Sequence, residues 1–340
     1  MHRSSALARI ITVIIAVVLA TLGVGLLTGG GRVWMYTVFQ YAREIDLGTL
    51  AGPTALQALG ILLLVAVVIT GIWSSAGLIA VGVLSLAPVI FAMFPVVFIA
   101  FQRAIRMPLE WTDGFVYGVP LVILPVLGTM GVVLAMVRRR PEPKGAALGL
   151  VGGVLSPVLL SAGVLLTVWG LSTGMQYAYQ LADWTVQPVT VLAVLGGVIL
   201  IVAGVGVTRW SSFALLLPAL FLLVINALVL LPDVLFPVLF QLPREITSAL
   251  PPLVIFGTGT ATAFLYLSYT FVLLRVRSRA QQARATSIAT PQFGQHPFSA
   301  HPTSPPSPAQ YFPGTGVGPG MHAPAVPLYP PTPGTGPTGS

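Results

Sequence analysis

Hydrophobic residues occur in eight long stretches that contain no charged side chain, and short polar segments separate them. Each stretch is close to or longer than the roughly 20 residues with which a helix crosses a bilayer. The pattern therefore predicts an all-α integral membrane protein with eight transmembrane helices. The predicted helices run from Ile10 to Gly29, Thr54 to Ile72, Ala76 to Phe101, Phe115 to Val137, Ala146 to Leu171, Pro188 to Val207, Phe213 to Leu231 and Pro251 to Leu274.

The second and third stretches are separated only by the tripeptide Trp-Ser-Ser. If the uncharged block 51–102 were one helix, with a rise of about 1.5 Å per residue, it would exceed twice the hydrocarbon thickness of a membrane. We therefore expect this block to cross twice. The whole chain is 56% hydrophobic and only 7% charged, which is more apolar surface than one soluble core can bury.

The charged residues predict the orientation. An even number of crossings places both termini on one side, which holds eleven basic residues against one acid, while the other side holds five against seven. The net charges are therefore +10 and −2, and the positive-inside rule makes the first side the cytoplasm. The cytoplasmic residues are Arg3, Arg9, Arg138, Arg139, Arg140, Glu142, Lys144, Arg209, Arg275, Arg277, Arg279 and Arg284, and the outer ones are Arg32, Arg43, Glu44, Asp46, Arg103, Arg106, Glu110, Asp113, Asp183, Asp233, Arg244 and Glu245.

This distribution predicts a multi-pass protein of a bacterial inner membrane with both termini in the cytoplasm. The predominance of arginine over lysine favours a bacterial source. Because topology accounts for the overall charge of +8, no nucleic-acid partner is needed. The first stretch also has the features of a secretory signal peptide, but its length and its match to a later helix favour a retained anchor.

The two halves of the chain resemble each other. TGIWSSAGL begins at Thr70 and VTRWSSFAL begins at Val207, an offset of 137 positions. Further blocks follow in the same order: GVGL and GVLL, FPVVF and FPVLF, PLVI twice (from Pro120 and Pro252), and VLAMVRRR and VLLRVRSR. This collinear order predicts two tandem four-helix repeats. Since each repeat crosses an even number of times, the two are parallel, and an axis along the membrane normal relates them.

The repeat sets the predicted domain boundaries. In each repeat, Trp-Ser-Ser forms a cytoplasmic hairpin in which a serine caps the next helix. We predict a cytoplasmic N-terminus (1–9), a first repeat (10–140), a basic linker (141–145), a second repeat (146–279) and a disordered tail (280–340).

Several classes of chemistry are excluded or disfavoured by composition. The chain has no cysteine, and its four histidines, His2, His296, His301 and His322, lie in the terminal segments. The eight predicted helices carry no ionisable residue of the kind that marks proton relays and haem sites in membranes. We therefore expect no catalytic residue, no metal site and no cofactor.

The polarity that remains in the predicted helices is uncharged. Thr258, Thr262, Tyr266 and Thr270 follow one another at four-residue steps and so share one face of the last helix. This stripe, together with Asn226, is a candidate substrate-binding surface. The alternative is that these groups only bond to backbone and neighbouring helices while small residues permit close packing.

The predicted outer loops contain the other candidates. Arg103 and Arg244 each follow one of the matched FPVVF and FPVLF blocks, so they are candidates for a pair of guanidinium groups that receive an anionic headgroup. Anchoring of the helices at the membrane surface is the alternative. Acids of these loops are compatible with an outward-facing transferase, although no spacing singles out an acid and base pair: Glu44, Asp46, Glu110 and Asp113.

The segment after Arg284 has no charged side chain and is dense in Pro, Gly, Ser and Thr, a composition typical of disorder. Its PxxP motifs make it either a docking tail for a cytoplasmic partner or a passive spacer. The basic segments next to the membrane attract anionic lipid headgroups.

Because the predicted membrane interior is uncharged, we expect a non-enzymatic carrier or permease-like component for an apolar or amphiphilic, lipid-like compound. The alternative is a membrane scaffold that recruits partners through the tail.

Overall fold

In the computed structural model, the described residues are 6–41, 47–139, 146–180, 185–228, 237, 241 and 253–289. The contacts divide the chain into Met1–Thr290 and Pro291–Ser340. The second unit lies wholly outside the described residues, as do Arg244, Glu44 and Asp46. The prediction of a disordered tail beyond residue 290 is therefore not tested.

The first unit is helical, with no strand among the described residues. Its first half contains α1 (Ala6–Tyr41), α2 (Leu47–Thr70), α3 (Ala76–Leu84), α4 (Leu86–Met93), α5 (Pro95–Ile105), α6 (Leu109–Val116) and α7 (Val119–Arg139). Its second half contains α8 (Ala146–Gln180), α9 (Pro188–Gly206), the 3-10 turn η1 (Val207–Arg209), α10 (Leu216–Leu228) and α13 (Thr258–Ala289). The last helix thus continues into the segment 280–340 that the sequence assigned to the tail.

Among the described residues, seven helical spans are long and apolar enough to cross a membrane: Arg9–Thr37, Gly48–Thr70, Ala76–Met93, Val119–Arg139, Val151–Met175, Pro188–Arg209 and Thr258–Gln282. The prediction of a multi-pass membrane protein agrees with this composition. The predicted helix Phe213 to Leu231 corresponds to α10, which has 13 described residues, and residues 229–236 lie outside the description.

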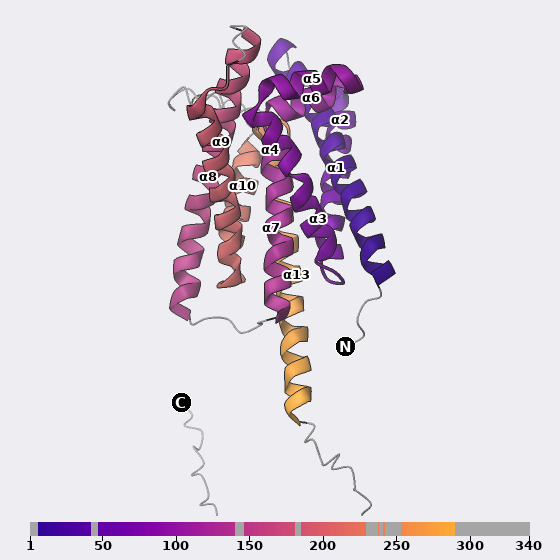
Figure 1. Ribbon diagram of the computed structural model, residues 1–340, viewed down its shortest axis with the longest axis vertical. Helices are drawn as coiled ribbons and strands as arrows, with labels where there is room; N and C mark the ends of the chain where they lie inside the picture. The colour runs from indigo at the N-terminus through magenta and orange to yellow at the C-terminus, as the bar shows by residue number, and fades with distance from the viewer. Residues whose placement is uncertain are drawn as a thin grey trace, which may run out of the picture. The chain divides into compact units, whose positions relative to one another are not determined.

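The boundaries of the third predicted helix need correction. The chain leaves the helical conformation at Phe94, whose φ is −128° and ψ is 81°, so Ala76 to Phe101 is not one helix. The physical reason is Pro95, because proline disfavours the helical conformation of the residue before it. The short helices α5 and α6 follow and lie across the upper end of the bundle (Figure 1). The fourth predicted helix accordingly begins at Val119 rather than Phe115.

Two long helix pairs, α1 with α2 and α8 with α9, pack through glycines. A Cβ atom on Gly60 would lie 2.7 Å from the carbonyl oxygen of Gly23, and one on Gly163 would lie 2.8 Å from that of Gly197. Both distances are shorter than real Cβ contacts. Only glycine therefore permits these backbones to approach so closely, as at small-residue interfaces of membrane helices.

The two Trp-Ser-Ser turns lie at the same end of the bundle, here called the hairpin end (residues 71–75 and 210–215), toward the lower part of Figure 1, where α13 extends beyond them. In the first turn the backbone N–H of Ala76 donates to Ser74 Oγ at 3.2 Å, whereas Ser75, the N-cap residue of α3, makes no side-chain cap. Ser212 of the second turn instead accepts a hydrogen bond from Arg277. The opposite end is called the α6 end.

The helices α7 and α13 begin in the same way. Gly118 (φ 80°) and Gly257 (φ 68°) have left-handed backbones, and their N–H groups donate to the third residue before them, at 2.9 and 3.0 Å. The two glycines are 139 positions apart, the offset that relates VLAMVRRR to VLLRVRSR. The predicted pairing of the two PLVI blocks stays a prediction, and it differs from this alignment, since Pro120 follows its glycine whereas residues 253–255 precede theirs.

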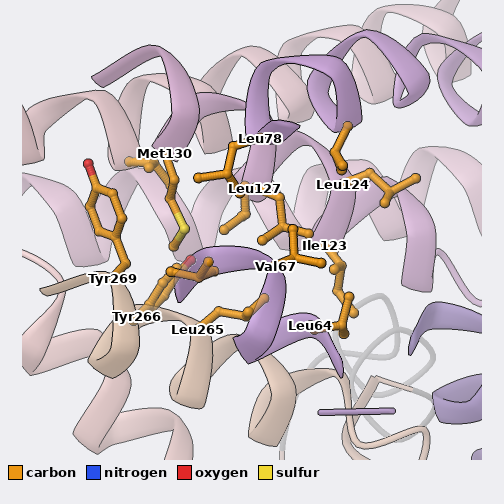
Figure 2. Packing of buried hydrophobic residues seen from close by; sticks show 14 of the residues in the cluster. Leu64, Val67, Leu78, Ile123, Leu124, Leu127, Met130, Leu265, Tyr266 and Tyr269 are labelled. Atoms are coloured by element: carbon orange, nitrogen blue, oxygen red, sulfur yellow. The ribbon is translucent and has the colours of Figure 1, made fainter. Parts of the chain in front are cut away.

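The core of the bundle lies around α7 and α13. Most of α7 is buried, and α7 contacts α3, α9 and α13, while α13 contacts α2 and α10. Figure 2 shows side chains of α2, α3, α7 and α13 converging on this core, including Met130 and Tyr266. The core is therefore predominantly apolar, with the Tyr269 hydroxyl 3.3 Å from that of Thr208.

Candidate functional site

The α6 end of the first half contains an apolar pocket with a volume of about 250 Å³. This is slightly below the roughly 300–1,000 Å³ of typical small-molecule pockets, so it suits one chain of an amphiphile better than a complete lipid. Its walls come from α1, α3, α4, α5, α6, α7 and the turn before α6. The lining residues are Thr21, Val24, Gly25, Thr28, Leu84, Pro88, Phe91, Phe98, Phe101, Met107, Trp111, Phe115, Pro120 and Leu124.

Aromatic packing and one glycine shape the pocket. The rings of Phe98 and Phe115 stack with centroids 4.2 Å apart, and those of Phe91 and Phe101 lie 4.8 Å apart. A Cβ on Gly25 would lie 2.9 Å from the Trp111 ring. The absence of a side chain at Gly25 therefore allows the indole to pack directly against α1. The break at Phe94 turns α5 so that its phenylalanines close the pocket.

An ion-pair cluster lies next to the pocket, on the same two helices. Arg32 follows the lining residue Thr28 by four positions on α1, and Glu110 and Asp113 flank the lining residue Trp111 on α6. Arg32 Nε lies 2.9 Å from Asp113 Oδ2, and Nη1 lies 3.4 Å from Glu110 Oε1. The guanidinium is also 5.4 Å from the ring centre of Tyr36. Charge-assisted contacts of this kind fix α6 against α1.

This cluster corrects the expectation that the membrane-spanning helices carry no charge. The apolar run ends at Gly29, but helix α1 continues to Tyr41 and so includes Arg32. The residue that sequence reasoning missed is therefore Arg32, together with its two carboxylate partners. Their sequence separations from it, 78 and 81 positions, leave no local signal. The one available signal in the sequence was that Arg32 follows Thr28 by four residues, which places both on one face of a helix.

Burial changes the acidity of the groups around the cluster. Desolvation raises the pKa of the Asp113 carboxyl, the nearby Arg32 lowers it, and Glu110 raises it, with a net increase. Burial also raises the pKa of Tyr117, and the charge of Asp113 adds to this effect. The site therefore combines a neutral cavity with a polar edge of mixed charge, an arrangement suited to an amphiphile. No group of metal-ligating side chains occurs within the described part of the chain.

The predicted stripe on α13 is buried. Thr258, Thr262, Tyr266 and Thr270 are at most 7% exposed, and Tyr266 belongs to the core. The Thr270 hydroxyl donates to the carbonyl of Tyr266 at 2.8 Å. The hydroxyls of Thr258 and Thr262 have no hydrogen-bond partner among the described residues, and each such orphan group costs about 1–3 kcal/mol.

The other predicted site residues do not meet in the described structure. The side-chain amide of Asn226 donates to the carbonyl of Leu222 at 2.7 Å and packs beside Gly259, which agrees with a packing role. Arg103 is exposed in the last turn of α5. Its predicted pairing with Arg244 stays a prediction, because Arg244 lies outside the described residues.

The folds and sequences of known proteins give no further guide to this site. No protein-family model matches the chain, and neither a curated protein nor a solved structure is similar to it.

Proposed function

We propose that the protein is a non-enzymatic carrier of an amphiphilic, lipid-like compound in a bacterial inner membrane, with both termini in the cytoplasm. The observation that carries the proposal is the apolar pocket beside the Arg32, Glu110 and Asp113 cluster. An apolar chain gains free energy by burial in the pocket, while its polar head stays at the charged edge. Arg103 and Arg106, near the end of α5, form no ion pair with a described residue, and their charge favours an anionic head.

We further propose that the chain has eight membrane helices in two tandem parallel repeats. The matched glycine contacts of α1–α2 and α8–α9 support this architecture. So do the contacts between the halves, where α13 packs on α2 as α7 packs on α9. The left-handed glycines before α7 and α13 add a third match. In this scheme the crossing added to the seven spans is the predicted helix Phe213 to Leu231, whose described part is α10.

The ligand pocket belongs to the first repeat. In the matched blocks GVGL and GVLL, Val24 corresponds to Val164 and Gly25 corresponds to Leu165. Gly25 makes room for the Trp111 ring, and a leucine at that position would displace it. The two repeats have diverged at the residue that the pocket requires.

The proposal is tested with a phosphatidylglycerol that carries a diazirine on one acyl chain. The protein is reconstituted in vesicles of phosphatidylethanolamine and phosphatidylglycerol, irradiated and digested. We expect cross-links to peptides that contain Met107 or Trp111. Val24→Phe fills the pocket and should remove most of them.

The matched control is Val164→Phe, since Val164 is also half-buried and packs against the core. This variant should leave the cross-links unchanged. Equal cross-linking of the two variants would reject the pocket as the chain-binding site.

Two other functions stay predictions. The scaffold function depends on a tail outside the described residues. A chain that lacks residues 290–340 tests the scaffold function, because full carrier activity without the tail would contradict that function. The transferase function also stays a prediction: two of its four candidate acids, Glu110 and Asp113, pair with Arg32, and Glu44 and Asp46 lie outside the described residues. Binding of anionic lipid headgroups by the basic residues near the hairpin end also stays a prediction. The same holds for binding of a cytoplasmic protein partner, because the tail that would bind it lies outside the described residues.

A further inference from the structure

Two aromatic residues at corresponding positions of the two halves touch each other. The ring centroids of Tyr117 and Phe256 lie 4.9 Å apart at an interplanar angle of 40°. The residues are 139 positions apart, and each comes directly before a left-handed glycine that starts a buried helix. Residues related by an approximate two-fold axis contact each other only near that axis. This contact therefore marks the point where the axis leaves the core toward the α6 end.

Each glycine also faces the opposite half. A Cβ on Gly118 would lie 3.3 Å from Val168 of α8, and one on Gly257 would lie 3.4 Å from Leu27 of α1. A left-handed backbone is readily available only to glycine, so each glycine makes the turn that places the preceding aromatic residue beside the start of its helix. Residues at the ends of helices, often small ones, are where hinges of moving segments commonly lie.

Two hydroxyls that follow Phe256 along the chain have no partner among the described residues. Thr258 and Thr262 are 2% and 4% exposed, and no hydrogen bond to a described residue satisfies either hydroxyl. Other buried threonines of these helices donate to their own backbone, as Thr129 does to Pro125 and Thr167 does to Gly163, both at 2.8 Å. Buried polar groups are normally bonded, so two exceptions one turn apart point to a missing partner.

We propose that Tyr117 and Phe256 form a gate between the two halves, and that it opens onto Thr258 and Thr262 as a binding site for an uncharged hydroxyl or carbonyl group. A threonine hydroxyl both donates and accepts, and residues 258–274 carry no charge, so a neutral polar group fits and an ion does not. The ester or hydroxyl oxygens of an amphiphile have this chemistry. The inference rests on the proposed carrier function, which gives the gate its use.

Cysteine labelling tests the gate, because the chain contains no cysteine of its own. Thr258→Cys and Thr262→Cys are reconstituted separately and treated with N-ethylmaleimide, a small uncharged thiol reagent, and intact mass gives the labelling rate. Thr167→Cys is the control, since Thr167 is equally buried but its hydroxyl is satisfied. We expect slow labelling at positions 258 and 262 and none at 167.

Removing an aromatic ring should favour the open state. In a Tyr117→Leu or Phe256→Leu background we expect labelling of Thr258→Cys to become about tenfold faster, as for a shifted two-state equilibrium. Phe264→Leu, at a ring that is 44% exposed, should leave the labelling rate unchanged. Met130→Ala is a second control, which shows whether a cavity elsewhere in the core also accelerates labelling. Either acceleration by Met130→Ala or no acceleration by both gate variants would overturn the proposal.

The double variant Thr258→Val, Thr262→Val tests the binding role. Because valine removes two orphan hydroxyls, the ligand-free protein in detergent should unfold at the same or a higher temperature, whereas Thr167→Val should lower it. A drop in stability of the double variant would show that both hydroxyls have structural partners and would reject the site. None of these outcomes alters the Val24→Phe test, so failure of the gate and failure of the carrier function are distinguishable.

Discussion

Arg277 on α13 donates from Nη2 to the carbonyl oxygen of Thr208, 3.1 Å away, in the turn η1 that follows α9. It also donates to the carbonyl of Arg209 at 2.9 Å. On α7, Arg138 makes the corresponding contacts with the carbonyls of Gly71 and Ile72 after α2. The last carbonyls of a helix lack intrahelical donors and carry partial negative charge. Each arginine thus closes a hairpin by satisfying them.

Arg277→Met is expected to destabilise the protein by about 2–3 kcal/mol, because hydrogen bonds to charged groups contribute about 1.5–3 kcal/mol and the carbonyls lose their donor. Arg138→Met should act in the same direction. Thermal unfolding in detergent measures both. Arg279→Met, which removes an exposed guanidinium from the same helix, serves as the control and should leave the midpoint unchanged.

Arg106 is the one described non-glycine residue with a left-handed backbone, at φ 51°, where it ends α5. Side chains are strained in this conformation by about 1 kcal/mol, so Arg106→Gly should raise the free energy of unfolding by up to that amount. Arg103→Gly removes the same charge inside α5 and should instead lower it by about 1 kcal/mol. Opposite signs in chemical denaturation would support the backbone argument, whereas equal losses would contradict it.

The helical spans could be predicted because apolar runs near the length of a membrane helix leave few alternatives. Their ends could not. The apolar run stops at Gly29, yet α1 continues for twelve more residues to Tyr41, because backbone hydrogen bonds do not depend on side-chain polarity. The break at Phe94 had a visible cause in Pro95, but proline also occurs inside α2, α7 and α8.

The candidate site was only partly predictable from the sequence. Composition indicated an apolar ligand, and the stripe on α13 contains the two orphan hydroxyls. The pocket itself depends on how α5 and α6 fold back over α1, which no local pattern specifies. The contact of Tyr117 with Phe256 was equally hidden, because the PLVI blocks suggested a different alignment of the fourth helices.

The glycine contacts give a test of the helix pairs. Gly60→Ala and Gly163→Ala should each destabilise the protein by about 1–3 kcal/mol, since the added methyl group meets a backbone that cannot yield. Gly153→Ala lies on the same helix as Gly163 but has nothing within 4 Å of the added atom. It should be neutral or stabilising by up to about 1 kcal/mol through helix propensity. Unfolding midpoints in one detergent compare the three variants, and a loss at Gly153 equal to that at Gly163 would refute the close-approach argument.

The raised pKa of Asp113 predicts how stability depends on pH. Burial is its largest cause, and the usual value for the unfolded chain is 3.8, so the folded state holds the proton more tightly than the unfolded state does. The contribution of Asp113 is therefore most favourable below that value and is lost as pH rises through the folded pKa. Asp113→Asn has no such dependence, so the stability of the wild type relative to this variant should fall as the pH rises from about 4 to 7.

Arg32→Gln removes the one cause that lowers the pKa of Asp113, and the fall in relative stability should then occur at higher pH. Thermal midpoints across this range measure both effects, and a relative stability that rises with pH would mean that the ion pair outweighs burial.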